Sequence, residues 1–385
     1  MTTMVSNEEK ARVWQAYHER KPIRVPLRWN VNARVLLLNP ALNPDGIGFQ
    51  EFFQDPQISL LVQVRFAEYL ATTLSQVCDY SWELPESWTF GVTCQNTYDA
   101  AYFGAEVRFE PGQVPGTHQF LSIDDVDWFL AQDYSRPLEN PWLKQQLAFR
   151  EALIEAARDF RYLGRGGTVA PFGLGFDGPL TVATNLFGED IFTLLGEDPE
   201  KAVQVLTHII NAAVLRNYAL ADLAGQPRKG DLAWSADDSI QLISTSMYEE
   251  YLLPLHELVY RSFSTTTLAD HRRFIHLCGD ATRHFKTIKE KLGVYSFDTG
   301  FPVDHGHLRE ELGEEVEISG GPRVDLLLGG TPAACAAETK RILQSGIMRG
   351  GRFILQEANN LPPCVPMENL QAVYATCLEY GRYEQ

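Results

Sequence analysis

His276 and Cys278 are the residues whose types and spacing point most directly to chemistry. A single residue separates them, and on an extended strand this spacing turns both side chains to the same face. An imidazole nitrogen and a thiolate sulfur suit Zn²⁺, which needs one or two further ligands. A zinc ion that keeps an open position deprotonates a bound substrate thiol and makes it a nucleophile. The competing interpretation is structural, with a buried cysteine next to a hydrogen-bonded histidine.

Acidic residues follow two other apolar runs, as Asp237-Asp238-Ser239 and as Asp298. Neighbouring residues on a strand point to opposite faces, so at most one of the two adjacent aspartates faces a pocket directly, and we favour Asp238. We predict that Asp238 and Asp298 orient substrate or shuttle protons. The alternative is that these residues cap the loops and helices that follow them.

Further polar residues at strand ends are candidates for contacting substrate. Arg28 is placed to bind a carboxylate, or to pair with one of the excess acids of the chain. The adjacent glycines 320 and 321 allow a ligand to approach closely, or form only a tight turn. We name Arg28, Asp238 and Asp298 as catalytic. The predicted substrate-binding residues are Trp29, Asn30, Asp177, Ser239, Gly320, Gly321, Asn359 and Asn360, with Asp177 the most typical of a turn.

These residues have to be positioned by strands that alternate with helices. Apolar runs predict eight strands, most of them separated by helical stretches of about a dozen residues. Eight such units predict an α/β fold of the (β/α)₈ TIM-barrel type, whose active site forms at the carboxyl ends of the strands. The alternative is an open doubly wound sheet, although no GxGxxG follows the first strand. The predicted strands span residues 25–29, 88–93, 168–171, 231–235, 274–278, 294–297, 316–319 and 353–356.

Residues 1–385 are predicted to form one domain, since no linker rich in Pro, Gly or Ser divides them. We predict an N-terminal helical extension over residues 1–22. An insertion over residues 94–167 separates the second and third strands and includes a long helix at 141–160. We expect residues 32–53 to be irregular, because they are rich in Asn, Pro and Gly.

Composition narrows the class of protein. Hydrophobic residues make up 45% of the chain, enough for a sizeable core. The formal net charge of −17 disfavours nucleic-acid binding, which depends on Lys and Arg neutralising phosphates. Six scattered cysteines without a CxxC pair do not suggest a disulfide framework. The N-terminus is polar, and no apolar run approaches the roughly 20 residues that span a bilayer. We therefore expect a cytoplasmic protein that binds neither nucleic acid nor membrane.

The order of motifs resembles the uroporphyrinogen decarboxylase superfamily, which includes methyltransferases that use corrinoid proteins or methylcobalamin. The resemblance covers nearly the whole chain and implies a (β/α)₈ barrel. It rests on Arg24-Val25-Pro26, on residues 103–109, on Phe176-Asp177-Gly178-Pro179, on residues 195–200, on Asp237-Asp238-Ser239 with Ser244 and Tyr248, on His276-Leu277-Cys278-Gly279, on Asp298, and on the closing segment 351–381.

Two branches of this superfamily differ in their site residues. The decarboxylases carry an Arg-Gln-Ala-Gly-Arg-Tyr motif after the first strand, and here only Arg28 and Arg34 match it as arginines. The methyltransferases hold zinc on a His-x-Cys pair and a distant Cys. That third position falls on Asn359 in this sequence, so the resemblance implies Glu357 as the third ligand, ahead of Cys364.

The resemblance favours a zinc-assisted methyltransferase that moves a methyl group between a small substrate and a corrinoid carrier, with His276, Cys278 and Glu357 on the metal. The first alternative is a metal-free decarboxylase of an acidic substrate, which Arg28 and Arg34 favour. The second is a barrel that has lost catalysis and acts as a binding protein, which Asn359 favours. A corrinoid protein and a second copy of the chain, as a homodimer, are the partners that the resemblance allows beside a small-molecule substrate.

Overall fold

The computed structural model describes residues 5–383, which form an α/β fold built on parallel strands. The main sheet has five strands in the order β5-β6-β7-β8-β9, each parallel to the next. Spatial order follows chain order because helical crossovers link successive strands. The strands are β5 (Ala233–Ala236), β6 (Arg273–Leu277), β7 (Val294–Thr299), β8 (Glu317–Gly320) and β9 (Phe353–Leu355).

The segment predicted as the first strand lies along the outer edge of β9. Leu27 forms a parallel bridge with Leu355. The N–H of Arg28 donates to the carbonyl of Leu355 at 3.0 Å, and the N–H of Leu355 donates to the carbonyl of Pro26 at 3.0 Å. Pro26 has no N–H to give, which keeps this pairing short. The main sheet therefore gains a short sixth strand at this edge.

The second and third predicted strands form a sheet of their own. β1 (Trp88–Phe90) pairs in parallel with β4 (Gly167–Val169). Seven of the eight predicted strand segments thus contain a strand, and the first, 25–29, pairs with β9 only around the bridge at Leu27. Within residues 5–383, however, no backbone ladder joins β1 or β4 to the main sheet, so the pairing expected of a closed barrel is incomplete. Both strands are three residues long and pack on helices of their own, which accounts for the difference.

A one-residue bulge in β7 sets the alignment of the centre of the main sheet. Phe274 of β6 pairs with Ser296, and Tyr295 is left as an extra residue on β7. A bulge of this kind shifts every later pair by one residue and changes which side chains share a face. As a result, His276 lies opposite Asp298.

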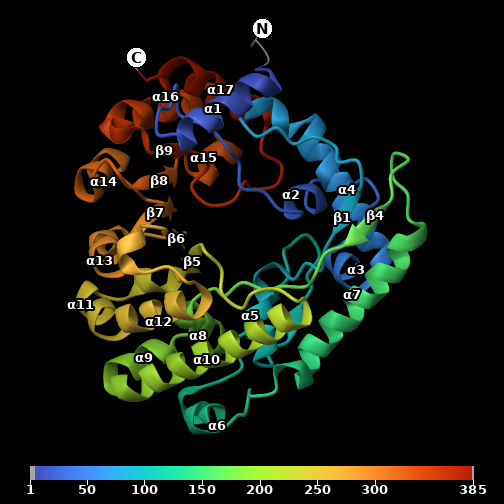
Figure 1. Ribbon diagram of the computed structural model, residues 1–385, viewed down its shortest axis with the longest axis vertical. Helices are drawn as coiled ribbons and strands as arrows, with labels where there is room; N and C mark the ends of the chain where they lie inside the picture. The colour runs from blue at the N-terminus through green and yellow to red at the C-terminus, as the bar shows by residue number, and fades with distance from the viewer. Residues whose placement is uncertain (1–4, 384–385) are drawn as a thin grey trace.

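Most of the longer helices run around the outside of the strands, whereas the short helices α2 and α5 lie nearer the middle of the molecule (Figure 1). Most of the helices from α8 onward cover the main sheet, whereas α4 and α7 pack together and on the sheet of β1 and β4. The helices are α1 (Asn7–His18), α2 (Arg34–Leu37), α3 (Phe49–Gln54), α4 (Pro56–Thr72), α5 (Tyr98–Tyr102), α6 (Val126–Leu130), α7 (Pro141–Asp159), α8 (Pro179–Phe187), α9 (Asp190–Glu197), α10 (Pro199–Leu223), α11 (Thr245–Met247), α12 (Leu253–Phe263), α13 (Thr282–Leu292), α14 (His305–Leu312), α15 (Val324–Gly329), α16 (Pro332–Ile342) and α17 (Met367–Tyr380).

The hydrophobic core is divided in the same way as the strands. The largest cluster lies between the main sheet and its helices, where Ile275 and Leu277 of β6 are completely buried. A smaller cluster joins Trp88 and Phe90 of β1 to α4 and α7, with Leu153 at its centre. The two sheets therefore have different apolar supports.

The segment 32–53 is more ordered than its composition predicts. It contains α2 and α3, and their Leu and Phe side chains form a third apolar cluster. The Asn43 side chain bonds the backbone at Leu37 and Ile47 and thereby shapes the connection between these helices. Long-range apolar packing, which a local composition does not report, explains the difference.

The insertion between β1 and β4 holds α5, α6 and α7 and a small antiparallel pair, β2 (Val107–Arg108) and β3 (Gly116–Thr117). The predicted long helix at 141–160 matches α7 within one residue. Over residues 5–383, none of the helices combines the length and apolar character needed to cross a membrane.

Candidate metal centre

Strand β6 places His276 and Cys278 on one face of the main sheet. Along β6 the residues alternate between buried and half-buried, and Ile275 and Leu277 take the buried positions against the helices. His276 and Cys278 therefore point to the opposite side, as their spacing predicts. The Nε2 atom of His276 lies 2.8 Å from the Sγ atom of Cys278. The two potential ligands face each other directly.

Asp238 completes a group of three potential metal ligands. Ligand atoms of Asp238, His276 and Cys278 all lie within 4.8 Å of one another, so a carboxylate oxygen, an imidazole nitrogen and a sulfur face a common point. Asp238 also accepts a hydrogen bond from the backbone N–H of Cys278 at 2.7 Å, which fixes its carboxylate at the strand end. This donor set suits Zn²⁺ and leaves a fourth position free.

Asp237 has a structural task, as expected when adjacent residues face opposite ways. Its buried carboxylate accepts hydrogen bonds from the backbone N–H groups of Leu180 and Thr181, at 3.2 and 2.7 Å. These are the unpaired donors in the first turn of α8. His256 Nε2 lies 3.0 Å from the same carboxylate. Asp237 therefore joins β5 to α8 and leaves Asp238 to face the centre.

Asp298 holds the imidazole of His276 from behind. Its Oδ2 atom lies 2.7 Å from Nδ1 of His276, so Nε2 is the ring nitrogen left to face Cys278. The other oxygen of Asp298 accepts a hydrogen bond from the amide of Gln356. Gln356 in turn accepts one from Nε of Arg28 at 2.7 Å. A carboxylate behind a metal-binding histidine fixes its tautomer and ring orientation.

The pKa values of the pair reflect competition between burial and hydrogen bonding. Burial opposes a charge on His276, but the hydrogen bonds with Asp298 and Cys278 outweigh it and raise the pKa of the imidazole to about 11. Burial raises the pKa of the Cys278 thiol, and the hydrogen bond with His276 opposes that rise. The centre thus favours a cation at the imidazole, and a metal ion that binds there has to displace that proton.

Glu357 lies outside this group of three. Its buried carboxylate accepts the backbone N–H of Asn30 at 3.1 and 3.2 Å, and burial holds its pKa well above the usual range. A protonated carboxyl is a poor metal ligand, because ligands must give up their protons. In place of Glu357, the geometry brings Asp238 to His276 and Cys278.

Asn359 and its neighbour Asn360 line the open side of Cys278. The Cys278 thiol donates to Oδ1 of Asn359 over 3.4 Å, and the amide of Asn360 donates to the same oxygen over 3.3 Å. The amide of Asn30 reaches the Asn359 carbonyl over 3.5 Å. These three predicted substrate-binding residues therefore lie together beside the sulfur. Cys364 is exposed, and its thiol contacts the carbonyl of Leu38.

Four other predicted site residues serve the fold. Trp29 is 2% exposed, and its indole N–H donates to the carbonyl of Val77 at 2.9 Å, so this side chain is not brought to the centre. A Cβ atom at Gly320 would lie 2.4 Å from the Thr299 hydroxyl, and one at Gly321 would lie 2.0 Å from a backbone carbonyl. Both glycines are needed for close packing. Ser239 is buried in the turn after β5, where its N–H donates to a threonine hydroxyl.

Asp177 belongs to a buried network after the β4 strand. Its Oδ1 atom accepts a hydrogen bond from the hydroxyl of Tyr98 at 2.6 Å, and its N–H donates to Asp99. Arg216 and Asp99 form a fully buried ion pair at 2.8 Å. Burial and the charge of Asp99 raise the pKa of Asp177 to about 7. Asp177 is therefore more than a turn residue.

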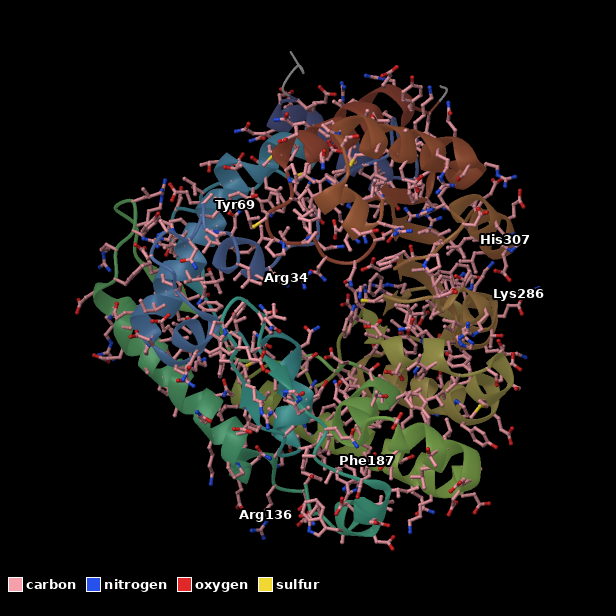
Figure 2. The ribbon with its side chains drawn as sticks, turned by 180° about the vertical axis from the view of Figure 1, so that it is seen from behind. Arg34, Tyr69, Arg136, Phe187, Lys286 and His307 are labelled. Carbon is pink, nitrogen blue, oxygen red and sulfur yellow. The ribbon has the colours of Figure 1, made fainter. Side chains whose placement is uncertain are left out.

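Gln356 was absent from the predicted set, and Arg34 was named only as a match to the decarboxylase motif. Gln356 links Arg28 to Asp298, and its place directly after the apolar run of β9 is the signal that marks it. Arg34 lies close enough to Glu357 and Cys278 for both to act on its pKa, which burial lowers. Its Nε atom is buried and has no hydrogen-bond partner among the described residues. Figure 2 shows Arg34 on the side of α2 that faces the middle of the molecule.

A family comparison covers most of the chain. The sequence model of the family described as uroporphyrinogen decarboxylase (URO-D) matches residues 94–380. That stretch includes Asp238, His276, Cys278 and Asp298, and it leaves out Arg28.

Comparison with solved structures finds a methyltransferase from Methanosarcina mazei, with a TM-score of 0.62 and 17% sequence identity, covering 97% of this chain and 99% of that chain. It also finds a B12-independent methionine synthase from Shewanella sp. W3-18-1 in complex with selenomethionine, with a TM-score of 0.41 and 11% identity, covering 87% and 90% of the two chains. The comparison with curated proteins gives no match. At these identities the likeness to the methyltransferase concerns the fold alone.

Proposed function

The chain belongs to the uroporphyrinogen decarboxylase (URO-D) family, and from this membership we propose that it is a zinc-dependent methyltransferase that moves a methyl group between a small substrate and a corrinoid carrier. The observation that carries the proposal is the meeting of Asp238, His276 and Cys278 at one point. The likeness in fold to a methyltransferase also supports the methyltransferase proposal. The (β/α)₈ barrel remains part of the proposal, with all eight strand segments around this centre.

The proposed roles follow from the contacts of each residue. Asp238, His276 and Cys278 would hold zinc, which when bound lowers the pKa of a substrate thiol in the open position. Asp298 keeps the Nε2 atom of His276 directed at the centre. Asn359 contacts Cys278 from the open side and is positioned to bind the substrate next to the metal. Arg28 reaches the centre only through Gln356, and we therefore propose a positioning role for it.

Metal analysis of the purified full-length protein tests the metal part. We expect about one zinc per chain after reconstitution, and loss of that zinc in His276→Ala and Cys278→Ser. Asp238→Asn keeps the hydrogen bond to the Cys278 backbone but removes the charged ligand, so it should bind zinc more weakly. Cys364→Ser is the matched control, because that cysteine is exposed and lies elsewhere. Wild-type protein without stoichiometric zinc would overturn this part.

The transfer reaction is tested separately with methylcobalamin and a small thiol such as 2-mercaptoethanol. The carbon–cobalt bond breaks with its electron pair left on cobalt, a carbon–sulfur bond forms, and the thiol proton passes to solvent. We expect the methylcobalamin absorption to decline only with zinc-loaded wild type, and Cys278→Ser to be inactive. A zinc-loaded protein that leaves methylcobalamin unchanged with a panel of thiols would contradict methyl transfer while keeping the metal centre.

A second candidate function, decarboxylation of an acidic substrate, rests on Arg34 and Asp177. Arg34 offers a buried Nε atom without a partner among the described residues, which suits a carboxylate. Asp177, with a pKa of about 7, suits proton transfer near neutral pH. Incubation of metal-free protein with uroporphyrinogen, followed by product analysis, separates the two candidates. Loss of carboxyl groups from the substrate would favour the decarboxylase.

A further inference from the structure

A cavity lies at the opposite end of the main sheet from the metal centre. Its volume is about 680 Å³, and residues at the amino ends of β5 to β9 line it. We call it the lower cavity and define it by Arg28, Trp234, Phe274, Tyr295, Glu317 and Arg352. Phe274 lies two residues before His276 on β6 and faces the same side. One layer of side chains therefore separates the lower cavity from the metal centre.

Aromatic side chains form much of the wall of the lower cavity. Trp234 is on a strand of the main sheet, yet 43% of it is exposed, because its indole faces the cavity. Tyr295 is the extra residue of the β7 bulge, and its ring stacks on His271 with 3.7 Å between centroids. Barrel interiors are normally filled by layers of side chains. Here the layer is incomplete, and the indole of Trp234 is the flat apolar surface open to a ligand, because the Tyr295 ring already stacks on His271 and has the Lys289 ammonium 5.4 Å from its centroid.

More arginines than glutamates line the lower cavity, although the net charge of the whole chain is −17. Arg272, Arg273 and Arg352 each have a carboxylate partner. Arg28 is half-buried and, among the described residues, forms no ion pair. Its hydrogen bonds go to the neutral side chains of Gln356, at 2.7 Å, and Ser319, at 3.3 Å.

A partly buried guanidinium without a counter-charge is costly, and an anionic ligand would offset that cost. Arg28 also keeps terminal N–H donors free for a carboxylate, which a guanidinium binds with a planar fork. Glu317 and Glu315 share the lining, and their charges disfavour an ion with two negative charges. Arg20 also lines the cavity and has no ion pair among the described residues, but it is exposed to solvent. Arg28 is therefore the partly buried positive charge that a single carboxylate would offset.

We propose that the lower cavity binds a small organic carboxylate with a flat, apolar body, whose carboxylate contacts Arg28 while its body packs on the indole of Trp234, beside Tyr295. This site is distinct from the metal centre and goes beyond the proposed methyl transfer. Its ligand enters from the amino ends of the strands, whereas the methyl-transfer substrates approach the carboxyl ends.

Titration of the full-length protein with phenylacetate tests this site, with phenylacetamide as the neutral probe of the same shape. Binding is followed by calorimetry and by tryptophan fluorescence. We expect phenylacetate to bind below about 10 mM, in the range typical of a fragment of this size, and the amide to bind at least about tenfold more weakly. The fluorescence change should disappear in Trp234→Phe while the calorimetric signal remains.

Variants locate the bound probe. Arg28→Gln should weaken phenylacetate binding by about tenfold or more, because it removes the charge but keeps a polar side chain. Arg136→Gln is the matched control, since Arg136 is an exposed arginine that does not line the lower cavity; Figure 2 shows it at the lower edge of the view. His276→Ala separates the two sites, because binding should survive the loss of the metal centre. Trp234→Leu, at an exposed position, tests the cavity without touching Arg28.

Three results would overturn the proposal. The first is equal affinity for phenylacetate and phenylacetamide, or no binding of either. The second is unchanged affinity in both Arg28→Gln and Trp234→Leu. The third is loss of binding in His276→Ala with Arg28→Gln unaffected, which would assign the probe to the metal centre. Each of these results is independent of whether the protein transfers a methyl group.

Discussion

Asn359 lies beside the sulfur of Cys278, 3.4 Å from it, in the position where a further thiol would face the metal centre. Asn359→Cys replaces a neutral amide oxygen with a thiolate that zinc prefers. We expect zinc affinity to rise by about tenfold or more, measured by competition with a chromophoric chelator.

The matched control for this change is Asn360→Cys. Asn360 donates to Asn359 and, among the described residues, forms no hydrogen bond with Cys278, so a cysteine at this position should leave zinc affinity near that of wild type. Equal tightening by both variants would mean that the third thiolate does not act at the centre formed by Asp238, His276 and Cys278.

The raised pKa of Asp177 predicts a pH dependence of stability. Its folded pKa of about 7 lies above the usual value of 3.8, so the folded protein holds this proton more tightly than the unfolded chain. Stability should therefore fall as pH rises between these values, by on the order of 2–4 kcal/mol at most. Asp177→Asn should remove that part of the slope.

Urea unfolding at about pH 5 and about pH 8 measures the effect of Asp177. The control is Asp124→Asn, an exposed aspartate, which should follow the wild-type slope. An unchanged slope in Asp177→Asn would show that other groups govern stability in this window.

The sequence predicts the potential metal ligands His276, Cys278 and Asp238 better than it predicts the residues around them. The one-residue spacing of His276 and Cys278, and the choice of Asp238 over Asp237, follow from strand geometry alone, and the structure has both. Glu357 and Trp29 also lie at the ends of apolar runs, but the Glu357 carboxylate accepts a backbone N–H and the Trp29 indole donates to a backbone carbonyl. Which way such a side chain turns depends on long-range packing that no local pattern contains.

At the scale of elements, close packing between strand ends fixes the position of Cys278. A Cβ atom at Gly300, directly after β7, would lie 1.6 Å from the backbone carbonyl oxygen of Cys278. Gly300→Ala should therefore displace the end of β6, lower the free energy of unfolding by about 1–3 kcal/mol and weaken zinc binding. Urea unfolding and zinc titration measure the two effects.

Gly173→Ala is the matched control for Gly300→Ala. It changes a glycine after β4 at which a Cβ atom meets nothing within 4 Å. This variant should unfold and bind zinc like wild type. If Gly300→Ala did the same, the strand ends would be more adaptable than their contacts indicate.

The sequence predicts a helix or strand well when the spacing of apolar residues within that segment is enough to define it. It does not predict which strands pair when the strands are far apart in the sequence. The helix α7 (Pro141–Asp159) matches its predicted range within one residue, and seven of the eight predicted strand segments contain a strand. The incomplete ring of strands was not predicted, because hydrogen bonding between β4 and β5 depends on their separation in space. The helices α2 and α3 were missed because Asn, Pro and Gly dominate that segment.

At the scale of the whole molecule, two sheets with separate apolar supports should open separately. The β1–β4 pair has three paired positions and the smaller core around Leu153, whereas β6 and β7 share the largest core. Native-state hydrogen exchange should therefore show earlier exchange at Phe90 and Val169 than at Ile275 and Phe297. Equal protection at both places would indicate one cooperative unit.

The bulge at Tyr295 has a consequence for how this site can be gained or lost among relatives. If β7 kept its length but paired without the bulge, His276 would face Phe297 instead of Asp298, and the imidazole would lose its supporting carboxylate although every functional residue was still present. A deletion of Tyr295 would remove the bulge and leave Asp298 opposite His276, whereas a deletion of Phe297, beyond the bulge, would bring Thr299 opposite His276 and take the carboxylate away from the imidazole. Whether a relative keeps this site should therefore be judged from the length and pairing of this strand as well as from its residues.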